Sequence, residues 1–109
     1  TPKQVADLVA DVRAVHDELE VGVHLHARPD TAAAKIRAAY EAGCRRFDAA
    51  IGGLGGCPFA QDALVGNVAT EILLTELKSL GAELVPLRPL DGLIAASAEI
   101  ARKYGERVQ

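Results

Sequence analysis

The chain has 109 residues, of which half are apolar, 4% are aromatic and a quarter are charged, and its formal net charge is −3. This composition is typical of one soluble globular domain over residues 1–109. The negative charge gives no reason to expect a nucleic-acid partner or an anionic membrane surface, and no segment approaches the roughly 20 uninterrupted apolar residues of a membrane span.

The two cysteines occur without the basic-then-apolar layout of a signal peptide at the start of the sequence. Reduced thiols in a cytoplasmic protein are therefore expected. Cys44 follows a helix-ending Gly43 and is expected to be a small buried hydrophobe. Cys57 lies in a very different setting, just after a run of glycines.

The first half of the sequence predicts helix, strand and helix. Thr1, Pro2 and Gln4 form a helix start of the capping-box kind, followed by apolar residues on one face through residue 19, with His16 in mid-helix as a structural or solvated residue. Residues 21–26 predict a short strand. A second helix, capped by Asp30 or Thr31, is expected to end at Gly43.

The second half predicts one more strand and two more helices. Residues 46–51 form the strand and run into the glycine-rich loop 52–56. Asn67 or Thr70 begins a helix that Gly81 stops, and Asp91 caps a last helix that ends near residue 105. Arg45 and Arg46, where the strand begins, are expected to be surface charges.

This order of elements predicts an α/β fold with parallel strands and right-handed crossovers. Two strands are clear, with a short third near Leu84-Val85 or just before Asn67. Such a sheet has open edges, which favours pairing with something else. Because a complete TIM (β/α)8 barrel needs about 250 residues, the chain is expected to be part of a barrel.

Two histidines at the end of the first strand are candidate metal ligands. His24 and His26 stand two residues apart, so both rings project from one face of the strand. Neutral imidazoles are common ligands of first-row metals, and the carboxyl ends of barrel strands are where active sites form. The alternative is that hydrogen bonds on a half-buried strand satisfy both rings.

Asn67 and Asp48 each have two interpretations. Asn67 is either a helix cap or a carbonyl ligand to a hard divalent ion. Asp48, on the second strand, is expected either to orient a metal ligand through a hydrogen bond or to form an ion pair.

The glycine-rich loop is the most unusual segment of the sequence. Four glycines in five residues, including Gly53, Gly55 and Gly56, suit a backbone that approaches a ligand or moves. Cys57 follows them directly, and a thiol there can transfer a proton in a site. The alternative is a flexible connecting or phosphate-binding loop with an incidental cysteine.

In this order the segments resemble the 3-hydroxy-3-methylglutaryl-CoA (HMG-CoA) lyases, and the resemblance covers essentially the whole chain. The matching segments are His24-Leu-His26, Ala-Gly-Cys-Arg-Arg-Phe-Asp48-Ala-Ala, Ile-Gly-Gly-Leu-Gly-Gly-Cys57-Pro-Phe-Ala and Gly-Asn67-Val-Ala-Thr-Glu71. The Gly-Gly-Leu-Gly-Gly-Cys-Pro loop is the specific element. The other segments are shared with a wider metal-dependent group that includes isopropylmalate and homocitrate synthases.

The resemblance implies a function and a set of site residues. His24, His26 and Asn67 would bind a Mg²⁺ or Mn²⁺ ion, which would chelate the substrate's hydroxyl and a carboxylate oxygen. Cys57 and His24 would transfer protons while an acyl-CoA is cleaved to acetyl-CoA and acetoacetate by retro-Claisen chemistry.

Two departures qualify the resemblance. The family usually has Asp-Thr after His-x-His, whereas this chain has Ala27-Arg28-Pro29-Asp30, and Arg28 suits recognition of a carboxylate or phosphate. The family's first-strand aspartate ligand and catalytic arginine have no counterpart here. The resemblance therefore implies that the chain is the C-terminal half of the barrel, approximately strands 6 to 8 with their helices, and that it is inactive alone. It is expected to associate with the missing N-terminal half or with itself as a homo-oligomer.

Two other functions stay open. One is a sibling condensing enzyme that runs the reverse Claisen chemistry. The other is a half-barrel module whose role is association without catalysis.

Overall fold

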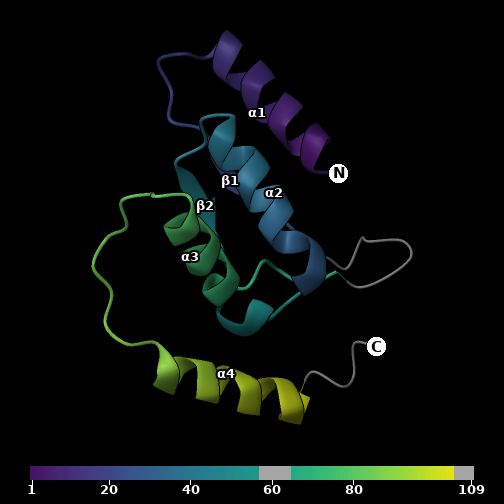
Figure 1. The fold of residues 1–109 in the computed structure, drawn as a ribbon. Coiled ribbons are helices and arrows are strands. Elements are labelled where there is room, and N and C mark those ends of the chain that lie inside the picture. The colour runs from purple at the N-terminus through teal and green to yellow at the C-terminus, as the bar shows by residue number, and fades with distance from the viewer. Residues whose placement is uncertain (57–64, 105–109) are drawn as a thin grey trace.

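The structure is a computed structural model that describes residues 1–56 and 65–104. Within these residues the elements are α1 (Pro2–Val15), β1 (Gly22–His24), α2 (Pro29–Glu41), β2 (Arg46–Asp48), the 3-10 turn η1 (Ile51–Gly53), α3 (Thr70–Ser79) and α4 (Asp91–Tyr104) (Figure 1). The predicted order of helices and strands is confirmed.

The two strands pair in parallel, as predicted, with His24 opposite Asp48 in the register. Both strands are shorter than predicted, because the chain beyond them bridges to a third segment. His26 forms an antiparallel bridge with Asn67, and Ala50 forms a parallel bridge with Ala69. The third segment of the sheet thus lies at residues 66–69, and residues 84–85 form no strand.

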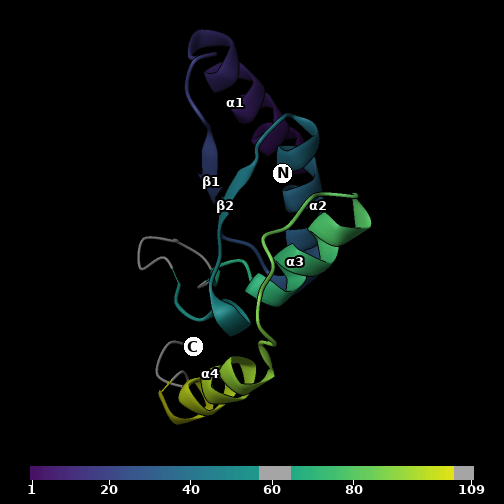
Figure 2. The same cartoon turned by 90° about the vertical axis from the view of Figure 1, so that its left-hand side faces the viewer.

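The helices cover one face of the strand pair, as Figure 2 shows for α2 and α3. Val23 and Phe47 point to this face and pack against the core, in which Ile36, Ala39 and Cys44 are fully buried. The alternate residues on the strands, Gly22, His24, Arg46 and Asp48, are exposed on the other face. One face of the sheet is therefore packed, and the other, which carries His24, is open.

Helix α1 begins as predicted. The N–H of Gln4 donates to Thr1 Oγ1 (3.2 Å), and the Thr1 amino group donates to Gln4 Oε1 (2.7 Å), which completes the capping box. The mid-helix placement of His16 is wrong, because α1 ends at Val15 and His16 is its C-cap residue, but His16 is solvent-exposed, in agreement with the solvated alternative.

Helix α2 begins earlier than predicted and ends where predicted. Its N-cap is Arg28 in place of Asp30 or Thr31, because Pro29 suits the first helical position and holds the residue before it in extended backbone. Gly43 has a φ of 102° and ends the helix, with the N–H of Cys44 donating to the carbonyl of Ala39 (2.9 Å). Gly81 ends α3 in the same way.

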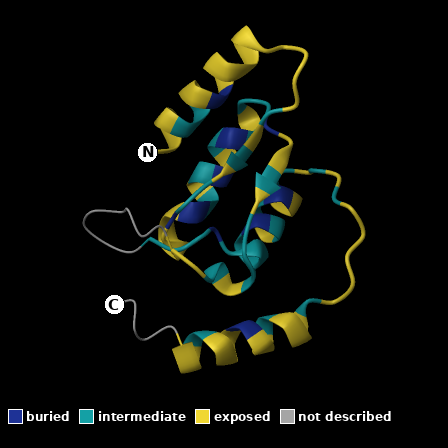
Figure 3. Cartoon of the chain, turned by 180° about the vertical axis from the view of Figure 1, so that it is seen from behind, coloured by how far each residue is buried: buried dark blue, intermediate teal, exposed yellow. Residues whose placement is uncertain are grey.

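Much of α1 and α4 is exposed, as Figure 3 shows. Val9 is buried, but Leu8 and Val15 on α1 are 65% and 72% exposed, because within the described residues only α2 packs closely on this helix. The radius of gyration is 14.8 Å, larger than the roughly 13 Å of a compact domain of this length. None of the described helices has the length and apolar character needed to cross a membrane.

Candidate metal centre

The two histidines lie side by side where β1 ends. His24 is the last residue of the strand, and the centroids of the His24 and His26 rings are 5.1 Å apart with their planes at 71°. The rings therefore share one face of the chain, as their spacing predicts. His24 is exposed, whereas His26 is half-buried.

Asn67 is brought directly opposite His26. The N–H of Ala27 donates to the carbonyl of Gly66 (3.2 Å), and the N–H of Val68 donates to that of Leu25 (3.3 Å), on either side of the bridge between His26 and Asn67. Side chains that face each other across such a pair have Cβ atoms about 5 Å apart. The backbone thus holds an imidazole and an amide close together, although 41 positions separate them in the sequence.

Among the described residues, the Asn67 side chain uses its amide nitrogen as a donor and leaves its amide oxygen without a partner. Its Nδ2 donates to the carbonyl of Leu54 at 2.7 Å. Its Oδ1 is buried and has no hydrogen-bond partner within the described residues, and the same holds for Nδ1 of His26. Because the N-cap of α3 is Ala69, Asn67 does not cap this helix. The helix-cap interpretation of Asn67 is therefore wrong.

Glycines allow the backbone to close around Asn67. At Gly53 (φ 68°) a Cβ atom would lie 2.9 Å from the backbone oxygen of Asn67, and at Gly55 (φ 90°) it would lie 2.9 Å from Asn67 Nδ2. Gly56 bridges to Gly66, and the N–H of Asn67 donates to the carbonyl of Gly55 (3.1 Å). The described part of the glycine-rich loop is therefore a close-fitting support for Asn67.

Asp48 is the neighbour of His24 on β2. Its Oδ2 lies 3.7 Å from His24 Nδ1, with the two side chains 65% and 55% exposed, respectively. This separation is longer than a hydrogen bond, and the exposure of both side chains makes any electrostatic interaction between them weak. Asp48 is thus placed beside a candidate ligand, and its role in orienting that ligand stays a prediction.

Arg28 and Cys57 complete the set of predicted site residues. Arg28 is 71% exposed, pairs with Asp30 through an Nε–Oδ1 distance of 3.2 Å, and lines a small pocket of 160 Å³ together with Gly53 and Asn67. Cys57 lies outside the described residues. Cys44 is fully buried as predicted, its thiol donates to the carbonyl of Arg46 (3.1 Å), and burial raises its pKa.

Two residues near this site had no assigned role in the sequence analysis. Glu71 accepts hydrogen bonds from the N–H of Gly52, and Ser97 donates one to the carbonyl of Ile51. Glu71 was visible only as part of the resembling Gly-Asn-Val-Ala-Thr-Glu segment, and nothing in the sequence singled out Ser97.

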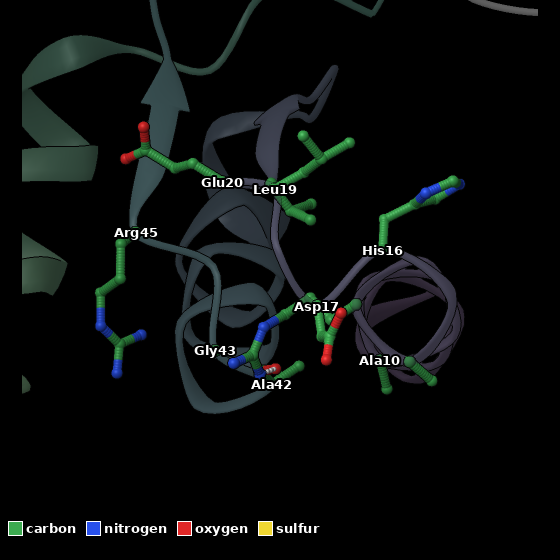
Figure 4. Close-up of a pocket in the computed structure, with 11 residues that line it drawn as sticks. Ala10, His16, Asp17, Leu19, Glu20, Ala42, Gly43 and Arg45 are labelled. Atoms are coloured by element: carbon green, nitrogen blue, oxygen red, sulfur yellow. Dashed lines mark hydrogen bonds between the residues drawn. The ribbon is translucent and has the colours of Figure 1, made fainter.

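A larger hollow of 490 Å³ lies at the opposite end of the strands (Figure 4). It lies between the C-terminal ends of α1 and α2 and includes Arg13, His16, Asp17 and Arg45. The Arg13 guanidinium donates to the carbonyl of Ala42 (2.9 Å), which caps the end of α2. This hollow is distinct from the site that carries His26 and Asn67.

These features define the class of the molecule: an α/β chain of parallel βα units with imidazole and amide groups gathered where its strands end. Residues 1–97 match the model of the HMGL-like family, and the chain belongs to that family.

Individual relatives agree with this assignment. The chain is 43% identical over 105 residues to (R)-citramalyl-CoA lyase of Chloroflexus aurantiacus, an alignment that covers 95% of this chain and 32% of that protein. It is 44% identical over 84 residues to the mitochondrial hydroxymethylglutaryl-CoA lyase of Gallus gallus, an alignment that covers 74% of this chain and 27% of that protein. It also resembles the structure of an HMG-CoA lyase from Acinetobacter baumannii in complex with coenzyme A and 3-methylmalate, with 37% identity and a TM-score of 0.73. The superposition covers 94% of this chain and 32% of that one.

The chain spans about a third of the length of the relatives it matches. The family predicted from the motifs is confirmed. The expectation of a C-terminal half is not supported, since the matched part is nearer a third of each relative. The assignment to barrel strands 6 to 8 stays a prediction.

Proposed function

We propose that this chain supplies part of the divalent-metal site of a carbon–carbon lyase acting on a 3-hydroxyacyl-CoA. His24, His26 and Asn67 would bind Mg²⁺ or Mn²⁺, and the substrate would be HMG-CoA or a close analogue. The names of the relatives, which include lyases for hydroxymethylglutaryl-CoA and for (R)-citramalyl-CoA, support this class of substrate. Acetyl-CoA and a keto acid, acetoacetate in the case of HMG-CoA, would be the products.

Two buried atoms that lack a hydrogen-bond partner among the described residues, His26 Nδ1 and Asn67 Oδ1, carry this proposal. A buried polar atom that lacks a hydrogen bond costs about 1–3 kcal/mol. Here two such atoms belong to residues that face each other across a bridge, and both are of types that bind divalent metals. The residues present therefore fit a cation, which would satisfy both atoms at once.

The bound ion would act as a Lewis acid that favours loss of the proton from the substrate's 3-hydroxyl group. Cleavage then converts this oxygen into the ketone of the keto acid, breaks the bond between C2 and C3, and leaves the electron pair on the acetyl-CoA carbon, which takes up a proton. Cys57 is the proposed donor of that proton, and His24 the proposed acid or base near the hydroxyl. Arg28 would exchange its partner Asp30 for a carboxylate or phosphate of the substrate.

The part of the chain that the structure describes supplies an incomplete site. Within the described residues, no group of three or more His, Cys, Asp or Glu side chains is placed to hold a metal ion. Two imidazoles and one amide leave positions that other residues must fill. We therefore propose that activity requires the remaining segments of a (β/α)8 barrel, and we call that assembly the complete enzyme.

A second candidate function is association without catalysis. Exposed apolar side chains on α1 and α4, such as Leu8 at 65% and Leu93 at 55%, support it. In the part of the chain that the structure describes, β1 pairs on one side only, which leaves an edge for another strand. Sedimentation of the 109-residue chain separates monomer from dimer, and a dimer without Mn²⁺ binding would favour this alternative.

Titration with Mn²⁺ tests the proposed metal site in the complete enzyme. We expect His26→Ala and Asn67→Ala each to weaken Mn²⁺ binding by more than about 100-fold. Removing a residue that only orients a metal ligand already lowers metal affinity about 10- to 100-fold, and removing a ligand should cost more. Thioester cleavage should fall with it. His16→Ala is the matched control, because His16 is exposed at the far end of the strands. Unchanged Mn²⁺ affinity in both site variants would overturn the proposal.

A further inference from the structure

One peptide group in η1 is held from two sides by residues on different helices. The carbonyl of Ile51 accepts a hydrogen bond from Ser97 Oγ on α4 at 2.8 Å. The N–H of the same peptide group, which belongs to Gly52, donates to both carboxylate oxygens of Glu71 on α3, at 2.9 and 3.0 Å. Both polar atoms of this peptide are thus occupied, which fixes the orientation of its plane.

Ser97 is the contact through which α4 meets η1. It is 7% exposed and is the buried residue of a helix that is otherwise mostly open to solvent, as Figure 3 shows. Ile94 and Ala101, three and four positions away, are half-buried on the same side. At Gly52, which has a φ of 67°, a Cβ atom would lie 2.6 Å from Ser97 Oγ, so only a glycine permits this approach.

The peptide held by Ser97 leads directly to the support of Asn67. Three residues along the chain from Ile51, the carbonyl of Leu54 accepts the hydrogen bond from Asn67 Nδ2 (2.7 Å). This bond uses the donor side of the Asn67 amide and thereby decides where Oδ1 points. The orientation of the Leu54 carbonyl depends in turn on the backbone of η1, where Gly52 and Gly53 could adopt other conformations.

We infer that Ser97, together with Glu71, is a positioning residue of the metal site. Held between these two side chains, η1 presents the Leu54 carbonyl to Asn67, so that Asn67 Oδ1 would be oriented to bind a cation together with His26. Ser97 would act through the backbone of η1, to which its hydroxyl is bonded, and is not itself a proposed ligand. The inference rests on the proposed function, because it assumes that Asn67 is a ligand. It also couples α4 to the metal site.

Mn²⁺ binding to the complete enzyme, with a matched serine control, tests the inference. Ser97→Ala removes the bond to Ile51, and we expect it to weaken Mn²⁺ binding about 10- to 100-fold, the range for residues that orient ligands. Ser97→Thr keeps a hydroxyl and should restore most of the affinity. Ser79→Ala makes the same substitution on α3, where the hydroxyl bonds to the carbonyl of Glu76 alone among the described residues, and should leave the affinity unchanged.

Hydrogen exchange of the metal-free enzyme gives a readout that is independent of the ion. In Ser97→Ala the amides of residues 51–55 should exchange faster than in the original protein, while those of α2 stay unchanged. If Ser97→Ala folds poorly, Glu71→Gln weakens the hold on the same peptide from α3 and should show both effects in milder form.

The Asn67→Ala variant distinguishes failure of the positioning role from failure of the proposed metal site. If Asn67→Ala loses Mn²⁺ affinity while Ser97→Ala and Glu71→Gln bind as the original protein does, the positioning role is overturned and the metal site stands. If Asn67→Ala binds Mn²⁺ normally, Asn67 is not a ligand and the positioning role is overturned, and if His26→Ala also binds normally, the proposed metal site is overturned with it.

Discussion

The two ends of the β1–β2 strand pair differ in whether their polar side chains have hydrogen-bond partners. Where the strands end, His26 Nδ1 and Asn67 Oδ1 are buried without partners within the described residues, next to a pocket of only 160 Å³. Where the strands begin, a hollow of 490 Å³ is lined by arginines that are already bonded. Arg13 donates to the carbonyl of Ala42, and Arg45 donates to those of Tyr40 and Cys44.

Unused bonding capacity, rather than the size of a hollow, is therefore the feature on which we base the proposed metal site. The guanidinium groups of Arg13 and Arg45 satisfy carbonyls at the end of α2, so they stabilise a helix end. The free imidazole nitrogen and amide oxygen at the other end have no structural function that the described residues reveal. Parallel βα units also place chemistry at the carboxyl ends of their strands.

The largest expected change in activity concerns Cys57, which follows the glycine-rich loop at the proposed metal end of the strands. We expect Cys57→Ala to lower the kcat of thioester cleavage by about 10²- to 10⁴-fold, the usual contribution of a positioned acid or base. Because the proposed role of Cys57 is proton transfer, Mn²⁺ affinity should stay as it is. The measurement is steady-state cleavage alongside Mn²⁺ titration, with Cys44→Ala as a control that affects stability instead. A Cys57→Ala enzyme with full kcat would remove the thiol from the mechanism.

The fold could be predicted from the sequence where local signals decide it. Thr1 with Gln4 and the glycines at 43 and 81 specified helix ends that the structure confirms. The spacing of His24 and His26 correctly predicted that their rings share a face. In each case the signal lies within a few residues, so no knowledge of distant contacts was needed.

Long-range contacts decided what the sequence could not predict. The bridge between His26 and Asn67 depends on how the chain returns after the glycine-rich loop, and no local pattern specifies that return. The hydrogen bond from Ser97 spans 46 positions and involves a common residue type in a helix. Leu8 is one of the apolar residues predicted on one face of α1, yet it is exposed, because among the described residues only α2 packs closely on this helix.

An intermediate effect is expected for Asp48. Asp48→Asn keeps the shape of the side chain but removes the charge beside His24 Nδ1. If Asp48 orients His24, Mn²⁺ affinity and kcat/KM should fall about 10- to 100-fold. The control is Asp7→Asn, which removes a similarly exposed carboxylate that pairs with Lys3 on α1. Equal, small effects in both variants would show that the His24–Asp48 contact is an ordinary surface ion pair.

The smallest effect on activity, and the most direct way to break the comparison, is expected at the opposite end. Arg45 donates to the carbonyl of Tyr40 at 2.7 Å, and its guanidinium lies 4.0 Å from the centre of the Tyr40 ring. Arg45→Ala should therefore reduce the free energy of unfolding by about 1–2 kcal/mol, measured by urea denaturation, while Mn²⁺ affinity and kcat stay unchanged. Arg45→Lys keeps the charge without the planar group and should recover only part of the stability. If Arg45→Ala instead lowered kcat/KM without changing the free energy of unfolding, the larger hollow would have to be part of the active site. A residue that only stabilises the end of α2 can change the reaction only by destabilising the fold.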